Sequence, residues 1–316
     1  MTTTHDTHTC DAERRGFLKQ GLLLGAAAVG GALAPQTAAA AEPIVRNGKP
    51  FMKLSLAAYS YRKYLNFKNP TMTMEDFITE AAALDLDGCE PTSYWFANYP
   101  NEIDEAYLLK LKQQAFRLGL DISGTAINNN FCLPEGEDRT KSLEHTRRWI
   151  DYAAILGAPV IRIFAGYVPP GDTFDAALKR CVAGVNEALE HAAQKGVVLA
   201  IENHGGITAE ADGLLAICEQ VNDSPWFGVN FDSGNFHTAD PYGDLAKIAP
   251  YAVNARIKVD MHPAGGEKQP ADIDRIVHIL ADADYRGYVV LEYEGAGEPK
   301  EEIPKYIEQL RKAIGR

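Results

Sequence analysis

Three carboxylates lie at or near the ends of apolar runs in the second half of the chain, and their spacing suits a shared site. Glu202 ends the run GVVLAIE, Asp232 ends FGVNFD, and Glu292 lies within YVVLEYE. From Glu202 to Asp232 is 30 residues, about the length of one strand–helix unit. Neighbouring parallel strands can therefore bring these groups together, although each residue alone could instead cap a helix.

Carboxylates that converge on one site repel each other, so a cation must lie between them or one of them must become protonated. We expect a divalent metal held by Glu202, Asp232 and Glu292. An oxygen-rich ligand set favours Mn²⁺ or Mg²⁺, and an added imidazole or amide also admits Co²⁺ or Zn²⁺.

Further polar side chains stand at comparable positions along the chain. Glu202 is followed by Asn203, His204 and two glycines, and these glycines let the backbone turn sharply beside the carboxylate. The remaining candidates for substrate binding or proton transfer are Glu90, Asn130, Arg162, Asn235, Arg256, Lys258 and His262.

The elements that must position these residues are short apolar runs alternating with helical stretches. Residues 178, 182, 185 and 189, and again 303, 307, 310 and 314, carry apolar side chains at helical spacing. Eight runs have the apolar composition of buried parallel strands, which predicts a single-domain (β/α)8 TIM barrel. No G-x-G-x-x-G turn follows any run, which disfavours a dinucleotide-binding fold. The runs are residues 54–60, 86–90, 120–127, 159–166, 196–202, 227–232, 254–260 and 288–294.

The first 41 residues are predicted to be a signal peptide that precedes the barrel of residues 42–316. Arg14 and Arg15 begin a basic segment, an apolar Gly/Ala/Leu run follows, and an Ala-rich cleavage site closes it. The paired arginines indicate Tat export, hence a periplasmic or extracellular protein with no membrane attachment after cleavage. The alternatives are a disordered basic tail and an uncleaved anchor.

The formal net charge of −12 disfavours nucleic acid as a partner, because an acidic surface repels phosphates. Four cysteines follow the signal peptide, at spacings that match no metal motif. We expect Cys89, Cys132, Cys181 and Cys218 to be buried free thiols.

The motifs IENHG (201–205), VNFDSGN (229–235), IKV (257–259) and LEYEG (291–295) resemble the xylose-isomerase-like sugar phosphate isomerase/epimerase family. The resemblance extends over residues 52–313. It implies a TIM barrel with its active site at the strand ends, and it implies that Glu202, Asp232 and Glu292 are three of four metal ligands.

The fourth ligand of the family, a His or Gln on strand 7, corresponds to Arg256 in this chain. Arginine stays protonated and does not ligate metals. Three explanations remain open: the correspondence is shifted by a residue or two, His262 or His204 completes the ligand set, or the Arg256 guanidinium occupies a metal-free pocket. Asn235 is a second departure, because epimerase relatives carry a substrate-contacting His there.

The resemblance implies proton abstraction from the carbon beside a carbonyl. A bound metal would stabilise the enediolate, and Glu202 and Glu292 would exchange protons with the substrate. Lys258 would hold a substrate oxygen or act as the acid, and its alternative is a buried ion pair. The residues expected to position substrate are Glu90, Asn130, Arg162, His204, Asn235, Arg256 and His262.

Export argues for an unphosphorylated sugar or keto-sugar as the small-molecule substrate. One alternative is a 3-keto-glycoside lyase or hydratase, and another is a non-catalytic sugar-binding barrel with Arg256 in place of the metal. An endonuclease of the same superfamily would need more histidines and a basic face than this chain offers. The resemblance leaves a homo-oligomer open.

Overall fold

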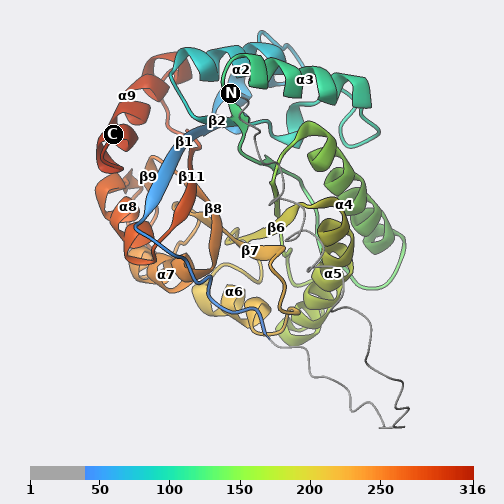
Figure 1. Cartoon of the computed structure of the whole chain (residues 1–316). Helices are drawn as coiled ribbons and strands as arrows, with labels where there is room; N and C mark the ends of the chain where they lie inside the picture. The colour runs from blue at the N-terminus through green and yellow to red at the C-terminus, as the bar shows by residue number, and fades with distance from the viewer. Residues whose placement is uncertain (1–39) are drawn as a thin grey trace, which may run out of the picture. The chain divides into compact units, whose positions relative to one another are not determined.

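The computed structural model describes residues 40–316, so the twin-arginine and apolar segments of the predicted signal peptide lie outside the described residues. Within these residues the helices form a ring around an inner set of strands (Figure 1). The nine-stranded sheet has the order β3-β2-β1-β11-β8-β7-β6-β5-β4, in which β11 lies beside β1 and all neighbours are parallel. The predicted single-domain TIM barrel is confirmed.

The strands follow the apolar runs of the sequence, with two short additions after the seventh run that pair as an antiparallel hairpin. They are β1 (Phe51–Ala57), β2 (Gly88–Glu90), β3 (Asp121–Ile122), β4 (Thr125–Ala126), β5 (Val160–Ile163), β6 (Val198–Glu202), β7 (Phe227–Asp232), β8 (Ala252–Ile257), β9 (Asp260–Met261), β10 (Gln269–Pro270) and β11 (Arg286–Leu291).

Helices cover the outside of the strands, and the predicted apolar stripes at 178–189 and 303–314 lie on or at the end of two of them. The helices are α1 (Arg62–Leu65), α2 (Met74–Ala83), α3 (Glu105–Arg117), α4 (Glu137–Leu156), α5 (Phe174–Lys195), α6 (Ala211–Cys218), α7 (Pro241–Ile248), α8 (Ile273–Asp282) and α9 (Pro299–Ala313), with single 3₁₀ turns η1 (Ala58–Tyr61), η2 (Ser93–Trp95) and η3 (Ala249–Tyr251).

The third predicted strand, residues 120–127, is interrupted at Ser123 and Gly124, and this interruption separates β3 from β4. A Cβ at Gly124 would lie 2.9 Å from Val160 Cγ1 and 3.3 Å from Glu90 Oε2. The chain therefore lacks a side chain where the backbone passes a buried carboxylate.

Several predicted strands end earlier than expected, and at two of them side chains replace the hydrogen bonds of the backbone ladder. The run 54–60 ends at Ala57, since Ser60 Oγ donates to Leu291 O at 3.1 Å and accepts from Tyr293 N at 2.9 Å. The run 254–260 ends at Ile257, where Lys258 N donates to Ser233 Oγ at 2.8 Å.

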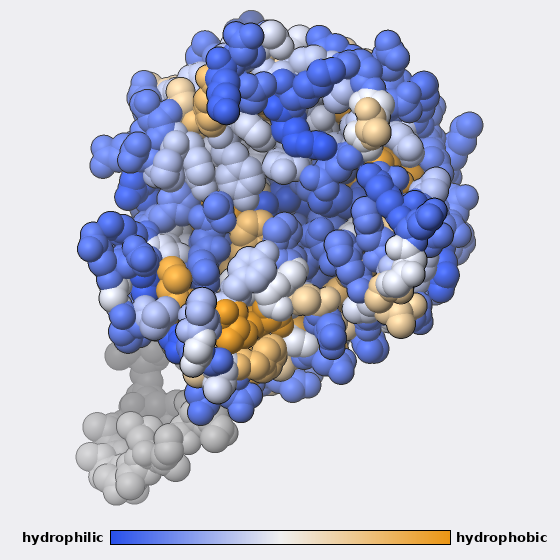
Figure 2. All heavy atoms as spheres, turned by 180° about the vertical axis from the view of Figure 1, so that it is seen from behind, coloured by the Kyte–Doolittle hydropathy of each residue, from blue (hydrophilic) through white to orange (hydrophobic). Residues whose placement is uncertain are grey.

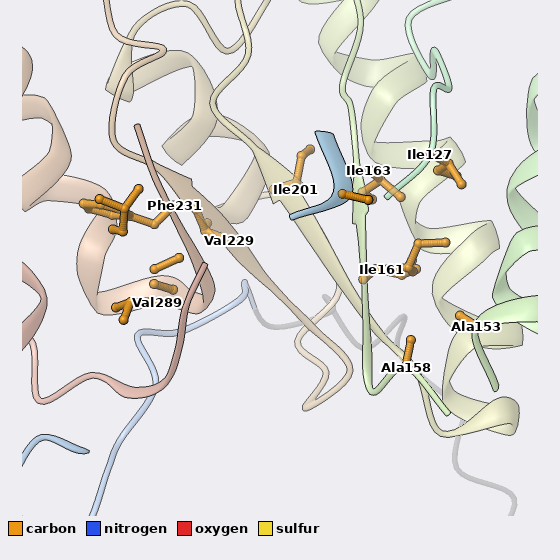
Figure 3. Packing of buried hydrophobic residues seen from close by; sticks show 14 of the residues in the cluster. Ile127, Ala153, Ala158, Ile161, Ile163, Ile201, Val229, Phe231 and Val289 are labelled. Carbon is orange, nitrogen blue, oxygen red and sulfur yellow. The ribbon is translucent and has the colours of Figure 1, made fainter. Parts of the chain in front are cut away.

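Successive residues of the strands face two different environments. Ile161, Ile163, Ile201, Val229 and Phe231 belong to the apolar layer shown in Figure 3. The polar residues between them, such as those at 162, 202 and 230, contact one another inside the barrel instead. Most strand residues are buried, yet the two-residue period sends apolar groups toward the helices and polar groups toward the axis.

The face shown in Figure 2 is mostly hydrophilic, with apolar side chains gathered in a few separate groups. None of the helices within residues 40–316 is long and apolar enough to cross a bilayer. The four cysteines of this region are buried free thiols, as expected from the sequence.

Candidate active site

Strand β8 and the residue after it send Asn254, Arg256 and Lys258 into the barrel at two-residue spacing. The Arg256 guanidinium crosses the axis to pair with Glu90 at the end of β2. Its Nη1 also lies 2.9 Å from Glu292 Oε2 and 3.6 Å from Glu202 Oε1. Arg256 therefore joins carboxylates from three different strand ends.

Arg256 stays positively charged, although it is only 1% exposed. Burial disfavours the charged guanidinium, but Glu292, Glu90 and Glu202 outweigh that cost and raise its pKa well above the usual value. Arg256 is a fixed cation at the centre of the barrel.

Two asparagines below this centre orient the carboxylates. Asn230 Nδ2 donates to Glu202 Oε1 at 2.7 Å, and Asn254 Nδ2 lies 3.1 Å from Glu90 Oε2 and 3.0 Å from Asn230 Oδ1. Both amides are buried. Because a buried carboxylate needs partners for its lone pairs, these contacts fix where Glu202 and Glu90 point.

Arg162 on β5 supplies a second buried guanidinium. Its Nε lies 3.3 Å from Glu202 Oε2, while Nη1 donates to Ile127 O at 2.7 Å and Nη2 to Tyr94 OH at 2.9 Å. With Arg256 it forms what we call the inner cluster, defined as Glu90, Arg162, Glu202 and Arg256. Each of these four side chains is at most 3% exposed.

The segment after β6 explains the polar run that follows Glu202. Asn203 Nδ2 donates to Asp232 O and its Oδ1 accepts from Asp232 N, both at 2.9 Å, so this amide continues the pairing of β6 with β7. Gly205 and Gly206 have φ values of +65° and +55°, which is the sharp turn expected from the sequence. A Cβ at Gly206 would lie 2.1 Å from Gly166 O.

His204 is placed by this turn against the ring of Phe164, with ring centroids 4.2 Å apart. Burial lowers the pKa of His204, and the nearby guanidinium of Arg162 adds to that effect. The ring is therefore a neutral wall of the barrel mouth at neutral pH.

Lys258 lies above Arg256 and contacts three carboxylates. Its Nζ is 2.6 Å from Glu294 Oε2, 2.9 Å from Glu292 Oε1 and 3.7 Å from Asp232 Oδ2. Burial opposes the charge, but Asp232, Glu292 and Glu294 raise the pKa of Lys258 well above its usual value. The buried ion pair considered from the sequence is present.

Glycine at position 234 makes room for this lysine. A Cβ there would lie 2.7 Å from both Lys258 Cβ and Cγ. The same turn lets Gly234 N donate to Asp232 Oδ1 at 2.9 Å. The sequence Asp-Ser-Gly after β7 therefore positions both Asp232 and the lysine stem.

Asp232 and Glu292 experience opposite environments although both are almost fully buried. Burial raises the pKa of Asp232 to about 8 against the attraction of Lys258, and its Oδ2 accepts no hydrogen bond. Burial also opposes ionisation of Glu292, but Arg256 and Lys258 outweigh it and lower the pKa of Glu292 to about 2. Glu292 is thus the firmly ionised member of the pair.

A cavity of about 360 Å³ opens directly over Lys258. We call four of its titratable residues, Lys258, Glu294, His237 and His262, the mouth group. The His237 and His262 rings lie 5.2 Å apart at an angle of 30°. The other lining residues are Arg62, Gly234, Asn235, Val259, Asp260 and Lys268, and a neighbouring cavity of about 760 Å³ shares Asn235 and His237 and includes His204.

The structure brings together most of the site residues predicted from the sequence. Glu90, Arg162, Glu202 and Arg256 form the inner cluster, while Asp232, Glu292 and Lys258 lie directly above it. His204, Asn235 and His262 line the cavities at the mouth. Asn130 stands apart, because it lines a different cavity and its Oδ1 accepts from Cys132 N at 2.9 Å.

Sequence reasoning missed four members of the arrangement, namely Glu294, Asn230, Asn254 and Tyr94. Three of them could have been found from the two-residue period: Glu294 follows Glu292, Asn230 precedes Asp232, and Asn254 precedes Arg256 at that spacing. Tyr94 carries no such signal, because it lies in a 3₁₀ turn after β2.

The donor set does not fit a divalent metal in this arrangement. Within residues 40–316 no group of three or more His, Cys, Asp or Glu side chains could hold a metal ion. Of the three expected ligands, Glu202 contacts Arg162 and Arg256, Glu292 contacts Arg256 and Lys258, and Asp232 faces Lys258. Asp232 Oδ2 and Glu292 Oε2 accept no hydrogen bond from the described residues, but Glu292 Oε2 lies 2.9 Å from Arg256 Nη1 and Asp232 Oδ2 lies 3.7 Å from Lys258 Nζ.

The sequence profile of the xylose isomerase-like TIM barrel family matches residues 78–313. No curated protein matches the chain. The structure is similar to that of D-psicose 3-epimerase from Clostridium cellulolyticum H10, solved with D-tagatose, at 17% identity and a TM-score of 0.65, covering 83% of this chain and 99% of that one.

Two other solved structures are similar over comparable lengths. One is 3-keto-D-glucoside 4-epimerase from E. coli, at 17% identity and a TM-score of 0.59, with 83% of this chain and 99% of that chain covered. The other is a probable 3-DHS dehydratase from Bacillus anthracis, at 18% identity and a TM-score of 0.61, with coverage of 84% and 99%. At these identities the likeness shows a shared fold.

Proposed function

Because the chain belongs to the xylose isomerase-like TIM barrel family, we propose that it is a sugar isomerase or epimerase that removes a proton from the carbon beside a carbonyl. The observation that carries this proposal is the placement of Lys258. A firmly protonated ammonium lies between Glu292 and Glu294 at the floor of an open cavity. That arrangement places a cation and a carboxylate beside any ligand that enters.

Lys258 would stabilise the oxyanion that develops when the α-proton leaves. A positioned charge in a site that excludes water is worth much more than the same charge in bulk water. The ammonium also carries protons that it can share with the substrate oxygen. The sequence-based expectation was that Lys258 holds a substrate oxygen or acts as the acid, and this proposal keeps both roles, with its carboxylate partners keeping it charged.

Glu294 is the carboxylate best placed to accept the proton. Its side chain is 34% exposed and it lines the cavity, whereas Glu292 is 4% exposed. The sequence-based proposal gave proton exchange to Glu202 and Glu292. Glu202 is 1% exposed and is held by Asn230, so we assign it the positioning of Arg162 and Arg256.

The substrate class we propose is an unphosphorylated sugar or keto-sugar. The named relatives with related folds include epimerases of free sugars and of a 3-keto-glucoside, which supports this class. Export by the Tat route to the periplasm or beyond is part of the same proposal. It rests on Arg14, Arg15 and the apolar run that follows them.

A 3-keto-glycoside lyase or hydratase is a second candidate, because the cavity offers further proton donors. His237 and His262 lie side by side in the cavity that contains Lys258. An elimination needs the same α-proton abstraction and then an acid for the leaving group. An imidazole is suited to that task near neutral pH.

A non-catalytic sugar-binding barrel is favoured by one observation, the ion pairs of Arg256 with Glu90 and Glu292. These pairs close the centre of the barrel to ligands. Lys258 and Glu294 still line the cavity, so we rank an enzyme above a binding protein.

The test is solvent exchange followed by proton NMR in D₂O, with free ketoses and 3-keto-glycosides as substrates. Each reaction is run with and without added Mn²⁺, and the Lys258→Met variant is compared with Lys258→Arg. Deuterium entering beside the carbonyl with formation of a new sugar supports the isomerase or epimerase, and exchange with release of the aglycone supports the lyase. Saturable binding without exchange supports the binding barrel.

A further inference from the structure

We propose that Arg256 and Lys258 permanently fill the place of a divalent cation among Glu202, Asp232 and Glu292, so that the site works without a metal. The inference rests on the proposed function and adds to it that the cations of this site are side chains.

The first argument is the occupancy of the carboxylates. A divalent ion would need their oxygens at about 2.0–2.2 Å. Arg256 Nη1 instead lies 2.9 Å from Glu292 Oε2 and 3.6 Å from Glu202 Oε1, and Lys258 Nζ lies 2.9 Å from Glu292 Oε1. Both oxygens of Glu292 therefore already face a nitrogen cation.

The second argument is that Arg256 cannot leave its position cheaply. It pairs with Glu90, which is fully buried and is itself held by Asn254. Moving the guanidinium aside to admit a metal would leave the charge of Glu90 buried without its partner, which is strongly destabilising. The contact across the barrel therefore locks the cation in place.

Lys258 is held by a separate set of contacts. Its ammonium contacts Glu294 at 2.6 Å, and its stem passes so close to Gly234 that no Cβ fits there. These contacts hold the ammonium 3.7 Å from Asp232 Oδ2 and 2.9 Å from Glu292 Oε1. The two nitrogen cations come from one strand end, two residues apart.

Two carboxylate oxygens among the described residues, Asp232 Oδ2 and Glu292 Oε2, have no hydrogen-bond partner. Glu292 Oε2 lies 2.9 Å from Arg256 Nη1, so only Asp232 Oδ2 is free of an arginine, and Mn²⁺ and Mg²⁺ both take several oxygen ligands. Lys258 Nζ lies 3.7 Å from Asp232 Oδ2 and already faces it with positive charge.

The experiment measures metal directly and needs no substrate. The purified protein, prepared without chelator, is analysed for Mn, Mg, Co and Zn by mass spectrometry and then titrated with Mn²⁺ while the free ion is followed by electron paramagnetic resonance. We expect no stoichiometric metal and no saturable Mn²⁺ binding. Melting temperatures with Mn²⁺ and with EDTA should coincide, because a ligand that binds only the folded state would raise them.

The Arg256→His variant replaces the central cation by a metal-binding nitrogen beside the same carboxylates. We expect it to gain saturable Mn²⁺ binding, which the wild type should lack. Arg256→Lys should not gain it, because it restores a cation. Arg139→His is the matched control, since Arg139 is also buried but donates to the backbone carbonyls of Phe131 and Leu133.

The wild-type measurement decides the matter even if the Arg256→His protein does not fold. About one metal per chain, or saturable Mn²⁺ binding that is lost in Glu292→Gln, would overturn the inference. Failure of the proposed function is a different result: a metal-free protein that exchanges no deuterium into any keto-sugar leaves the filled site standing. A metal-loaded protein that does exchange deuterium supports the function and refutes this inference.

Discussion

The inner cluster and the mouth group both pair carboxylates with nitrogen-bearing side chains, but they differ in exposure. Glu90, Arg162, Glu202 and Arg256 are at most 3% exposed. Lys258 and Glu294 contact each other and also line a cavity of about 360 Å³. The ion pairs of the inner cluster have a structural role, whereas the ion pair of Lys258 with Glu294 keeps one side open to a ligand.

This difference separates structural support from the proposed chemistry in this barrel. A buried ion pair contributes little net stability by itself, but removing one partner is costly because the other charge stays buried. An ion pair at a cavity can exchange its partner for a substrate group. Substitutions in the two regions should therefore affect different measurements.

The largest effect is expected from Arg256→Met, which breaks the inner cluster. The change leaves Glu90, Glu202 and Glu292 without a shared cation and should lower the free energy of unfolding by about 3–5 kcal/mol. Urea unfolding followed by circular dichroism measures this. A loss below about 1 kcal/mol, within the range of a surface ion pair, would mean that the cluster is not structural.

Glu294→Gln should instead affect the mouth while sparing the fold. With the proposed base removed, we expect kcat to fall about 100-fold and the free energy of unfolding to change by less than about 1 kcal/mol. Deuterium exchange into the substrate measures the change in kcat, and urea unfolding measures the change in the free energy of unfolding. Glu298→Gln, which removes only the surface partner of Lys63, should change neither.

The adjacent glycines after β6 offer a matched pair that alters the mouth wall without touching an ion pair. Gly206→Ala would place a Cβ 2.1 Å from Gly166 O, and we expect a loss of about 2 kcal/mol together with a displaced His204. Gly205→Ala has the same positive φ, but its Cβ would meet nothing closer than 3.5 Å, so about 1 kcal/mol is expected. Equal losses would show that the φ angle alone matters.

The smallest expected effect is a loss of folding stability in acid. It must be measured separately from any loss of activity of the mouth group. Burial, aided by Arg148, lowers the pKa of His145 to about 4. The unfolded chain takes up this proton below pH 6.5 and the folded protein does not, so stability falls as the pH drops from 6.5 to 4 and levels off below that. Allowing for its partial exposure, we expect on the order of 1–2 kcal/mol.

His145→Gln is the matching variant for that measurement. Thermal melting at pH 7 and at pH 4.5 should show a smaller difference for the variant than for the wild type. An unchanged difference would assign the acid sensitivity to other groups, such as the carboxylates above the inner cluster.

Much of the fold could be predicted from the sequence because parallel strands and amphipathic helices leave strong local patterns. Seven of the eight apolar runs each became one strand of the barrel, and the run at 227–232 was matched to the residue. The break at Gly124 could not be predicted, because it depends on the approach of Glu90 from another strand. The ends of β1 and β8, where Ser60 and Ser233 form hydrogen bonds, likewise depend on long-range contacts.

The sequence predicted which residues belong to the site better than it predicted what each of them does. Polar residues at strand ends must meet at one barrel mouth, so Glu202, Asp232 and Lys258 were brought together as expected. Which carboxylate is sealed and which faces a cavity depends on depth along the barrel axis. That depth is set by strand register, and residue type does not reveal it.

Arg256 has a final consequence for how the protein matures. A site whose central cations are side chains is complete when the chain folds, since both are synthesised with it. If the site works without a metal as proposed, no loading step, metal chaperone or particular metal supply is needed in whichever compartment folding takes place. Under the proposal, the amino-acid sequence alone supplies the positive charge at the centre of this barrel. The metal ions in the surroundings do not contribute to it.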